Sequence, residues 1–160
     1  MGRGSGDPPA TLSCVGGSRP AGMFRRRSPD APPEVAKSDD EWRDQLTSEQ
    51  FRVLRRGGTD RAFSGPLWDH HGDGSYRCAG CDAVLFEADA KFDSGTGWPS
   101  FSEPAVAEAV TFHRGLLGMR TEVRCRRCDG HLGHVFRDGP RPTGERYCIN
   151  DSALRVDGAD

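Results

Sequence analysis

The sequence predicts a mainly β domain of antiparallel strands, with two short helices at its N-terminal edge. Glycine and proline make up 32 of the 160 residues, a share typical of many short strands and turns rather than of a helical bundle. Only 34% of the residues are hydrophobic, so we expect a modest core that needs a second source of stability. Two Cys-x-x-Cys pairs, Cys78/Cys81 and Cys125/Cys128, indicate that this source is a bound metal.

Residues 1–37 are predicted to form a disordered leader and residues 38–160 the folded domain. The leader is rich in glycine, proline, serine and arginine and has almost no apolar periodicity. The arginine run 25–27 leaves organellar targeting open, and Met23 leaves a later true start open. No apolar run is long enough for a signal peptide or a membrane span, so we expect a soluble, cytoplasmic protein.

Two short helices are expected directly after the leader. Ser38 precedes a run of acidic residues, which is typical of a helix N-terminus, and Trp42 opens an apolar i, i+4 pattern. Thr47 and Gln50 form a capping-box pattern at the start of the second helix. The glycine pair 57–58, which follows two arginines, is expected to end that helix.

From about residue 65 onward, short apolar runs separated by turn residues predict strands. The segment Ser94 to Phe101 contains two glycines and is expected to be a loop, and the segment Asp138 to Gly144 is expected to be a turn that joins two strands. We predict strands at residues 76–78, 83–86, 122–125, 131–136, 146–150 and 153–156.

The four paired cysteines are typical of a closed structural zinc site. Each Cys-x-x-Cys pair supplies two thiolates from one tight turn, and a tetrahedral zinc ion takes four. A four-thiolate shell leaves no open position, so the metal would hold the fold together and take no part in catalysis. The alternative interpretation is two pairs of buried or redox-active cysteines.

Cys148 is the candidate reactive residue, because it stands apart from the paired cysteines. A lone cysteine is more often an inert buried residue, but Arg146 and Asn150 lie two positions to either side. On a strand these three side chains share one face, where the arginine charge would favour the thiolate and lower the pKa of Cys148. A nucleophile, a cation and a hydrogen-bonding amide would then stand in one row.

Histidines and aromatic residues complete the candidate site. His131 and His134 are expected to donate protons or hydrogen bonds rather than bind metal, because the zinc shell is already full. Trp98 and Phe101 could line an apolar pocket, or they could simply belong to the core.

From about residue 38 to residue 156, the chain resembles the B-type methionine sulfoxide reductases, which reduce the R epimer of methionine sulfoxide. The resemblance rests on Lys91-Phe92-Asp93-Ser94-Gly95, Gly97-Trp98-Pro99-Ser100-Phe101, the two Cys-x-x-Cys pairs, His131-Leu132-Gly133-His134-Val135-Phe136, Asp138-Gly139-Pro140 and Gly144-Glu145-Arg146-Tyr147-Cys148-Ile149-Asn150. Together these motifs are very specific.

The resemblance implies two antiparallel sheets in a β-tent, with short N-terminal helices and one structural Zn²⁺ per chain. It implies that the Cys148 thiolate attacks the sulfoxide sulfur and becomes a sulfenic acid, while Arg146 helps keep the thiolate. The same match assigns His131, His134 and Asn150 to the hydrogen-bonded active-site network. Trp98 would pack on the S-methyl group of the substrate, together with Phe136.

One position departs from the family pattern. Many members carry a resolving cysteine where this sequence has Thr96, so the sulfenic acid must react with an external thiol or with another cysteine of the chain. Cys14 in the leader is the only cysteine left for such a role, and it could equally be incidental. Thioredoxin is the expected reductant, with oxidised proteins or small methionine sulfoxides as substrates.

Two other functions remain open from the sequence. A zinc-ribbon-like binding module could grip a partner through Arg124, Arg126 and Arg127, but residues 38–160 hold 16 basic against 21 acidic residues, which disfavours nucleic acid. A cysteine redox sensor would form the sulfenic acid with peroxide and would not turn over methionine sulfoxide. We expect a monomer with no membrane partner.

Overall fold

Two short helices come first in the part of the chain that the computed structural model describes, residues 31–118 and 120–157. Helix α1 spans Asp39–Gln45 and helix α2 spans Ser48–Arg56. The Ser38 and Thr47 side chains each accept a hydrogen bond from the backbone N–H three residues on, within complete capping boxes. Gly57 ends α2 in the left-handed conformation, with φ of 67°. Both predicted helices are therefore confirmed, with their caps.

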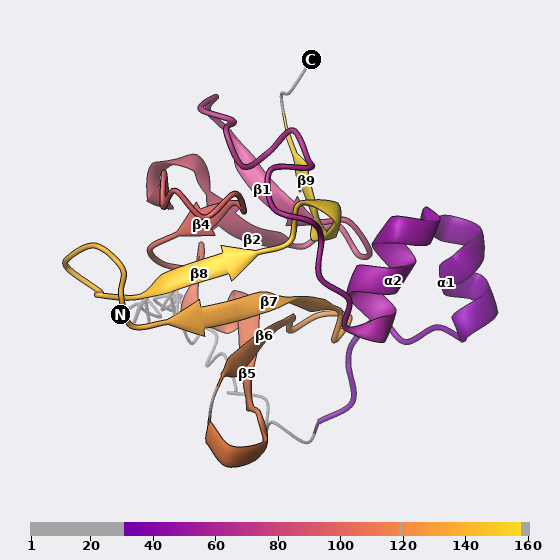
Figure 1. Ribbon diagram of the computed structural model, residues 1–160. Helices are drawn as coiled ribbons and strands as arrows, with labels where there is room; N and C mark the ends of the chain where they lie inside the picture. The colour runs from indigo at the N-terminus through magenta and orange to yellow at the C-terminus, as the bar shows by residue number, and fades with distance from the viewer. Residues whose placement is uncertain (1–30, 119, 158–160) are drawn as a thin grey trace, which may run out of the picture.

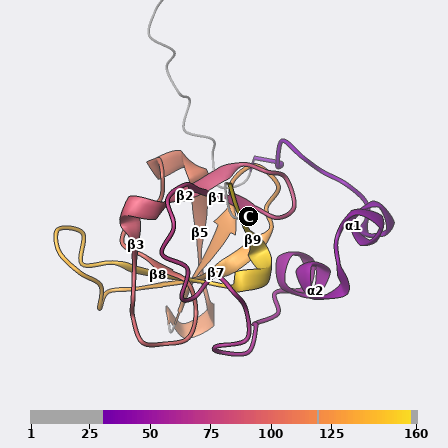
Figure 2. The same cartoon turned by 90° about the horizontal axis from the view of Figure 1, so that it is seen from above.

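The helices lie side by side at one edge of the molecule (Figures 1 and 2). Helix α2 contacts strand β7 (His131–Phe136) and the short 3₁₀ turn η4 (Asp151–Ala153). Trp42 of α1 and Val53 and Leu54 of α2 are buried against the core.

The strands form two antiparallel sheets, as the family resemblance implies. The smaller sheet has the order β2-β1-β9 and the larger one the order β3-β4-β8-β7-β6-β5. The remaining strand bounds are β1 Ser75–Cys78, β2 Val84–Glu87, β3 Lys91–Phe92, β4 Ser100–Phe101, β5 Val110–Arg114, β6 Thr121–Cys125, β8 Arg146–Ile149 and β9 Leu154–Val156.

Aromatic rings from both sheets join the two layers. Phe101 of the larger sheet is fully buried and stacks on Phe86 of the smaller one, with ring centroids 4.3 Å apart. Tyr76 meets the same Phe101 ring edge-on at 4.9 Å, and Tyr147 approaches Phe86 at 5.8 Å. Phe101 therefore belongs to the core, which was one of the two alternatives left open by the sequence.

Three strands were not predicted. Ser100 and Phe101 form β4, inside a segment that we expected to be a loop, because β8 pairs with them on one side and β3 on the other. Strand β5 buries only its first residue, Val110, and pairs with β6 along its whole length. Its alternating Val-Thr-Phe-His-Arg pattern was the signal that could have revealed it.

The packed structure begins earlier than the predicted domain start at Ser38. Val35 packs against the core, and its N–H donates a hydrogen bond to the Arg127 carbonyl oxygen at 2.9 Å. Cys14 lies outside the described residues. None of the helices in the described ranges has the length and apolar character needed to cross a membrane.

Candidate active site and metal centre

Cys148 lies in β8, between β7 and β4 of the larger sheet. His134 is its direct partner on β7, and Ser100 is its partner on β4. Arg146 stands two residues earlier on β8, opposite Phe136 of β7. Directly paired residues of antiparallel strands share a face, so Cys148, His134, Arg146 and Phe136 form one patch on the sheet.

A cavity of about 250 Å³ lies at this patch. Six of the seven residues that the sequence analysis assigned to the reactive centre and substrate pocket line it, and the seventh, His131, does not. The full lining is Thr59, Thr96, Trp98, Arg120, Gly133, His134, Phe136, Arg146, Cys148 and Asn150. Thr59 and Arg120 belong to no motif in the sequence, so they could not be predicted as site residues.

His131 lies behind His134. Residues three apart on a regular strand face opposite sides, but a register shift between β6 and β7 leaves Leu132 without a partner on β6 and brings the two rings within 5.5 Å. His131 Nδ1 hydrogen-bonds Glu122 Oε1 at 2.8 Å, and its buried Nε2 has no partner among the described residues. Burial, followed by the charges of His131 and Arg120, lowers the pKa of His134. His134 is thereby favoured as a neutral imidazole.

Burial dominates the protonation of Cys148 and raises the pKa of its thiol. The charge of Arg146 and hydrogen bonds with Thr96 and Arg146 act in the opposite direction. The charge of Arg146 therefore favours the thiolate, but the predicted lowering of the Cys148 pKa is not found. The net pKa nevertheless lies above the ordinary value, because removing the thiolate from water costs more than these contacts return.

Arg146 is fixed by two neighbours. Its Nε and Nη2 donate to the two carboxylate oxygens of Asp138, at 2.8 and 3.0 Å, and this pairing raises the pKa of Arg146. Its guanidinium carbon also lies 4.4 Å from the centroid of the Phe136 ring. The same cation thus influences Cys148 and orients one aromatic wall of the cavity.

Asn150 and Trp98 are tied together through Asp60, which the sequence analysis missed. The Asn150 amide accepts from the Asp60 N–H at 2.8 Å and donates to the Leu132 carbonyl oxygen at 3.0 Å. The indole N–H of Trp98 donates to the Asp60 carbonyl oxygen at 2.9 Å. The buried Asp60 carboxylate accepts two hydrogen bonds from Ser152. Asn150 therefore positions the cavity wall through backbone contacts.

Three hydroxyl groups, two in the loop before β4 and one in β4 itself, form a chain next to Cys148. Thr96 hydrogen-bonds Cys148, and its Oγ1 lies 2.8 Å from Ser94 Oγ. Ser94 Oγ lies 2.7 Å from Ser100 Oγ, which donates to the Trp98 carbonyl oxygen at 3.1 Å. Thr96 is thus part of a polar chain that ends at the backbone carbonyl of Trp98.

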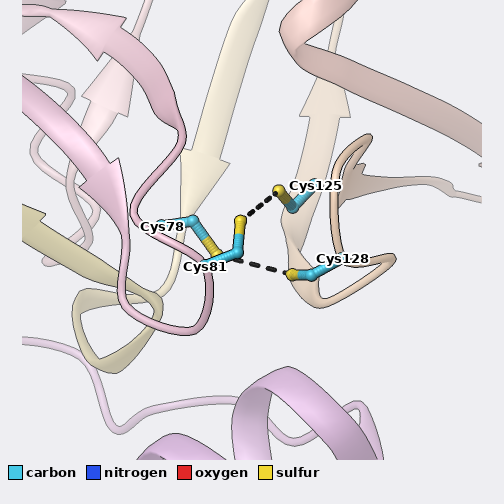
Figure 3. A group of neighbouring side chains, drawn as sticks. All are labelled: Cys78, Cys81, Cys125 and Cys128. Carbon is cyan, nitrogen blue, oxygen red and sulfur yellow. Dashed lines mark hydrogen bonds between the residues drawn. The ribbon is translucent and has the colours of Figure 1, made fainter. Parts of the chain in front are cut away.

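The four paired cysteines meet where the turn after β1 approaches the turn after β6 (Figure 3). Their sulfur atoms all lie within 4.8 Å of one another, with Cys78 to Cys128 at 3.7 Å and Cys81 to Cys125 at 3.5 Å. A tetrahedral ion with metal–sulfur bonds of about 2.3 Å spaces its ligands about 3.8 Å apart, whereas a disulfide needs about 2.05 Å. The donor set therefore fits a metal ion. None of the four lines the Cys148 cavity.

One family model and several known proteins match most of the chain. A family model described as the SelR domain matches residues 46–158. The peptide methionine sulfoxide reductase MsrB of Synechococcus sp. (strain RCC307) is 57% identical over 130 residues, which cover 80% of this chain and 94% of that protein. The protein of the same name from Agrobacterium fabrum is 58% identical over 124 residues, covering 76% and 92%. That from Thiobacillus denitrificans is 58% identical over 123 residues, covering 74% and 91%.

Proposed function

Because this chain belongs to the SelR-domain family of B-type methionine sulfoxide reductases, we propose that it reduces the R epimer of methionine sulfoxide to methionine, in proteins and in small substrates. The single observation that carries the proposal is the placement of Cys148 in a cavity lined by both polar and aromatic side chains. A sulfoxide combines the same two characters, because its sulfur carries a polar oxygen and an apolar methyl group.

The aromatic wall would hold the methyl group. Trp98 is fixed by its hydrogen bond to Asp60, and Phe136 by the guanidinium of Arg146. Rigid rings leave little conformational entropy to lose when the substrate binds. The sulfoxide sulfur would then lie over Cys148, with its oxygen toward His134, the direct cross-strand neighbour of that cysteine.

The reaction requires a nucleophile and a proton. The sulfoxide oxygen is a poor leaving group until it is protonated, and the raised pKa of Cys148 keeps a proton on the thiol of the free enzyme. That proton would pass through His134 to the oxygen as Cys148 attacks the sulfur, with His131 and Glu122 supporting the imidazole from behind. The methionine sulfur gains two electrons, and Cys148 receives the oxygen as a sulfenic acid.

The thiol of Cys148 would be regenerated by a reductant from outside the chain. Thr96 stands at the position where many relatives carry a resolving cysteine, and no other described cysteine lines the cavity. Thioredoxin or another thiol reductant would attack the sulfenic acid to release water, and a second thiol would then free Cys148. Cys14, which lies outside the described residues, is the internal alternative.

The metal would be one structural Zn²⁺, held by Cys78, Cys81, Cys125 and Cys128. The sulfur spacing and the purely thiolate donor set support zinc, and a closed shell gives it no catalytic step. Reduced, metal-binding cysteines are typical of the cytoplasm, where we place the enzyme as a monomer.

Single-turnover reduction tests the proposal. Prereduced protein is mixed with separated R and S epimers of N-acetylmethionine sulfoxide, with Cys148→Ser as the control. We expect one methionine per chain from the R epimer and none from the S epimer or the variant. Absence of turnover by metal-loaded wild type would refute the reductase and favour a binding module. Sulfenic acid formed with peroxide, without turnover, would favour a sensor.

A further inference from the structure

We propose that Glu122 is a positioning residue for the reduction step, because its carboxylate stabilises the positive charge that His134 carries while the proton of Cys148 passes to the sulfoxide oxygen. This inference rests on the proposed function and adds to it the counter-charge of the histidine. Glu122 would touch neither the substrate nor Cys148, so its loss should slow the step without weakening substrate binding.

Glu122, His134 and Cys148 stand in one row across three neighbouring strands. In the larger sheet, Glu122 of β6 pairs directly with His134 of β7, and His134 pairs directly with Cys148 of β8. The register shift between β6 and β7 begins only after Val123, so it does not disturb this row. Directly paired residues share a face, with Cβ atoms about 4.5–5.5 Å apart. A carboxylate, an imidazole and a thiol therefore follow one another, in the order of an acid–histidine–nucleophile triad.

The side chain of Glu122 is held as a carboxylate. Arg124 donates from Nε and Nη2 to its two oxygens, at 2.7 and 3.1 Å, and His131 Nδ1 hydrogen-bonds Oε1 at 2.8 Å. Burial by itself would raise the pKa of Glu122, but these hydrogen bonds outweigh it and lower the pKa. The side chain is only 23% exposed, so water screens its charge incompletely.

His134 lies where a positive charge is otherwise disfavoured. Burial is the main influence on its pKa and lowers it, and the charges of His131 and Arg120 act in the same direction. The charge of Glu122 opposes them. The proton would leave the sulfur of Cys148 for the imidazole and then go to the sulfoxide oxygen, so the ring ends neutral, as it began. The imidazolium exists only between these two transfers, and Glu122 would lower its free energy.

Glu122 reaches His134 from the β6 side, whereas Cys148 reaches it from the β8 side. A second cavity, of about 570 Å³, is lined by Glu122, His131 and His134. His134 is the residue that this cavity shares with the Cys148 cavity. A substrate in the Cys148 cavity would therefore contact His134 but not Glu122. An interaction that acts only while the imidazole is charged changes the rate and leaves substrate affinity as it was.

The test is single-turnover reduction of N-acetylmethionine R-sulfoxide by prereduced, metal-loaded protein, which gives the rate constant at saturating substrate and the apparent dissociation constant separately. Glu122→Gln removes the charge at constant size, and Glu122→Asp keeps the charge on a side chain one methylene shorter. Glu87→Gln is the matched control, because Glu87 is also a strand residue whose carboxylate accepts a hydrogen bond, from Ser75, and it lines neither cavity. Urea titration shows whether each variant is folded.

We expect Glu122→Gln to lower the rate constant about 100-fold, the lower end of what general acid–base catalysis contributes, with a dissociation constant within about twofold of wild type. Glu122→Asp should fall between wild type and Glu122→Gln, and Glu87→Gln should match wild type.

The inference is overturned if Glu122→Gln keeps the wild-type rate constant, if Glu122→Asp is as slow as Glu122→Gln, or if the loss lies in the dissociation constant. If Glu122→Gln does not fold, Glu122→Asp decides: a lower rate constant at unchanged affinity supports the inference, and a wild-type rate constant overturns it. If wild type itself reduces no substrate, the proposed function fails.

Discussion

A methyl group added at Gly133 should separate the two strands that carry His134 and Cys148, the proposed reactive groups. Gly133 of β7 pairs with Ile149 of β8, next to the His134–Cys148 pair. A Cβ atom there would lie 2.0 Å from the carbonyl oxygen of Cys148, whereas ordinary contact begins near 3.4 Å. The obstacle is backbone, which no side-chain rotation can relieve. The strands must therefore move apart locally by more than 1 Å.

Gly133→Ala should reduce both stability and activity. Overpacking of this kind costs about 1–3 kcal/mol in the free energy of unfolding, which urea titration measures. A displacement of about 1 Å between reacting groups costs on the order of 100-fold in rate. We therefore expect kcat/KM for N-acetylmethionine R-sulfoxide, with dithiothreitol as reductant, to fall about 100-fold.

Gly80→Ala is the matched control. Gly80 is also buried, but an added Cβ would meet its nearest neighbour, Trp42, at an ordinary 3.4 Å. Its stability and kcat/KM should stay close to wild type. The reasoning is refuted if Gly133→Ala unfolds within about 0.5 kcal/mol of wild type and keeps at least half of its activity.

Four further predictions concern the core, the metal and the titrating groups. Phe101→Ala should lower the free energy of unfolding by about 3–5 kcal/mol in urea titration, because it empties the contact between the sheets; a loss under 1 kcal/mol would contradict this. Chelation of the metal should lower the thermal midpoint and added Zn²⁺ should restore it, with metal content measured in parallel; an unchanged midpoint after complete removal would show that the metal is not structural. Because burial lowers the pKa of His134, the stability it contributes is present above the ordinary histidine pKa of about 6.5 and is lost as pH falls through the lowered folded-state pKa. Urea titrations at pH 7 and pH 5 should therefore differ less in His134→Gln than in wild type, and an equal difference would count against the assignment. Thr96→Val removes a hydrogen bond that lowers the pKa of Cys148, so the pH profile of Cys148 alkylation by iodoacetamide should move to higher pH, and a shift to lower pH would contradict the contact.

Local signals allowed the helices and most strands to be predicted. Capping residues such as Ser38 and Thr47 act within three residues of themselves, so their effect is visible in the sequence. Strand β4 has only two residues and exists because β3 and β8 pair with it, which is a tertiary cause. A two-residue strand has no period of its own to detect.

In the candidate site, too, some features follow from local sequence and others depend on the whole fold. Cys148 and Arg146 share a face because of strand alternation, which the spacing reveals. Asp60 belongs to no motif. It matters because the side chains of Asn150 and Trp98, which lie far from it in the sequence, hydrogen-bond its backbone. The raised pKa of Cys148 could not be predicted from the sequence either, because burial is a property of the whole fold.

The pairing of β1 with β9 has a consequence for how this chain is made. Tyr76 pairs with Val156, so the smaller sheet lacks one of its three strands until residues 154–156 have been synthesised. Strand β8, which joins β4 to β7 in the larger sheet, leaves the ribosome only after both of these neighbours. Until then the edges of β1, β4 and β7 stay unpaired and open to aggregation. Premature termination before residue 146 would therefore leave a chain that lacks Cys148 and can complete neither sheet.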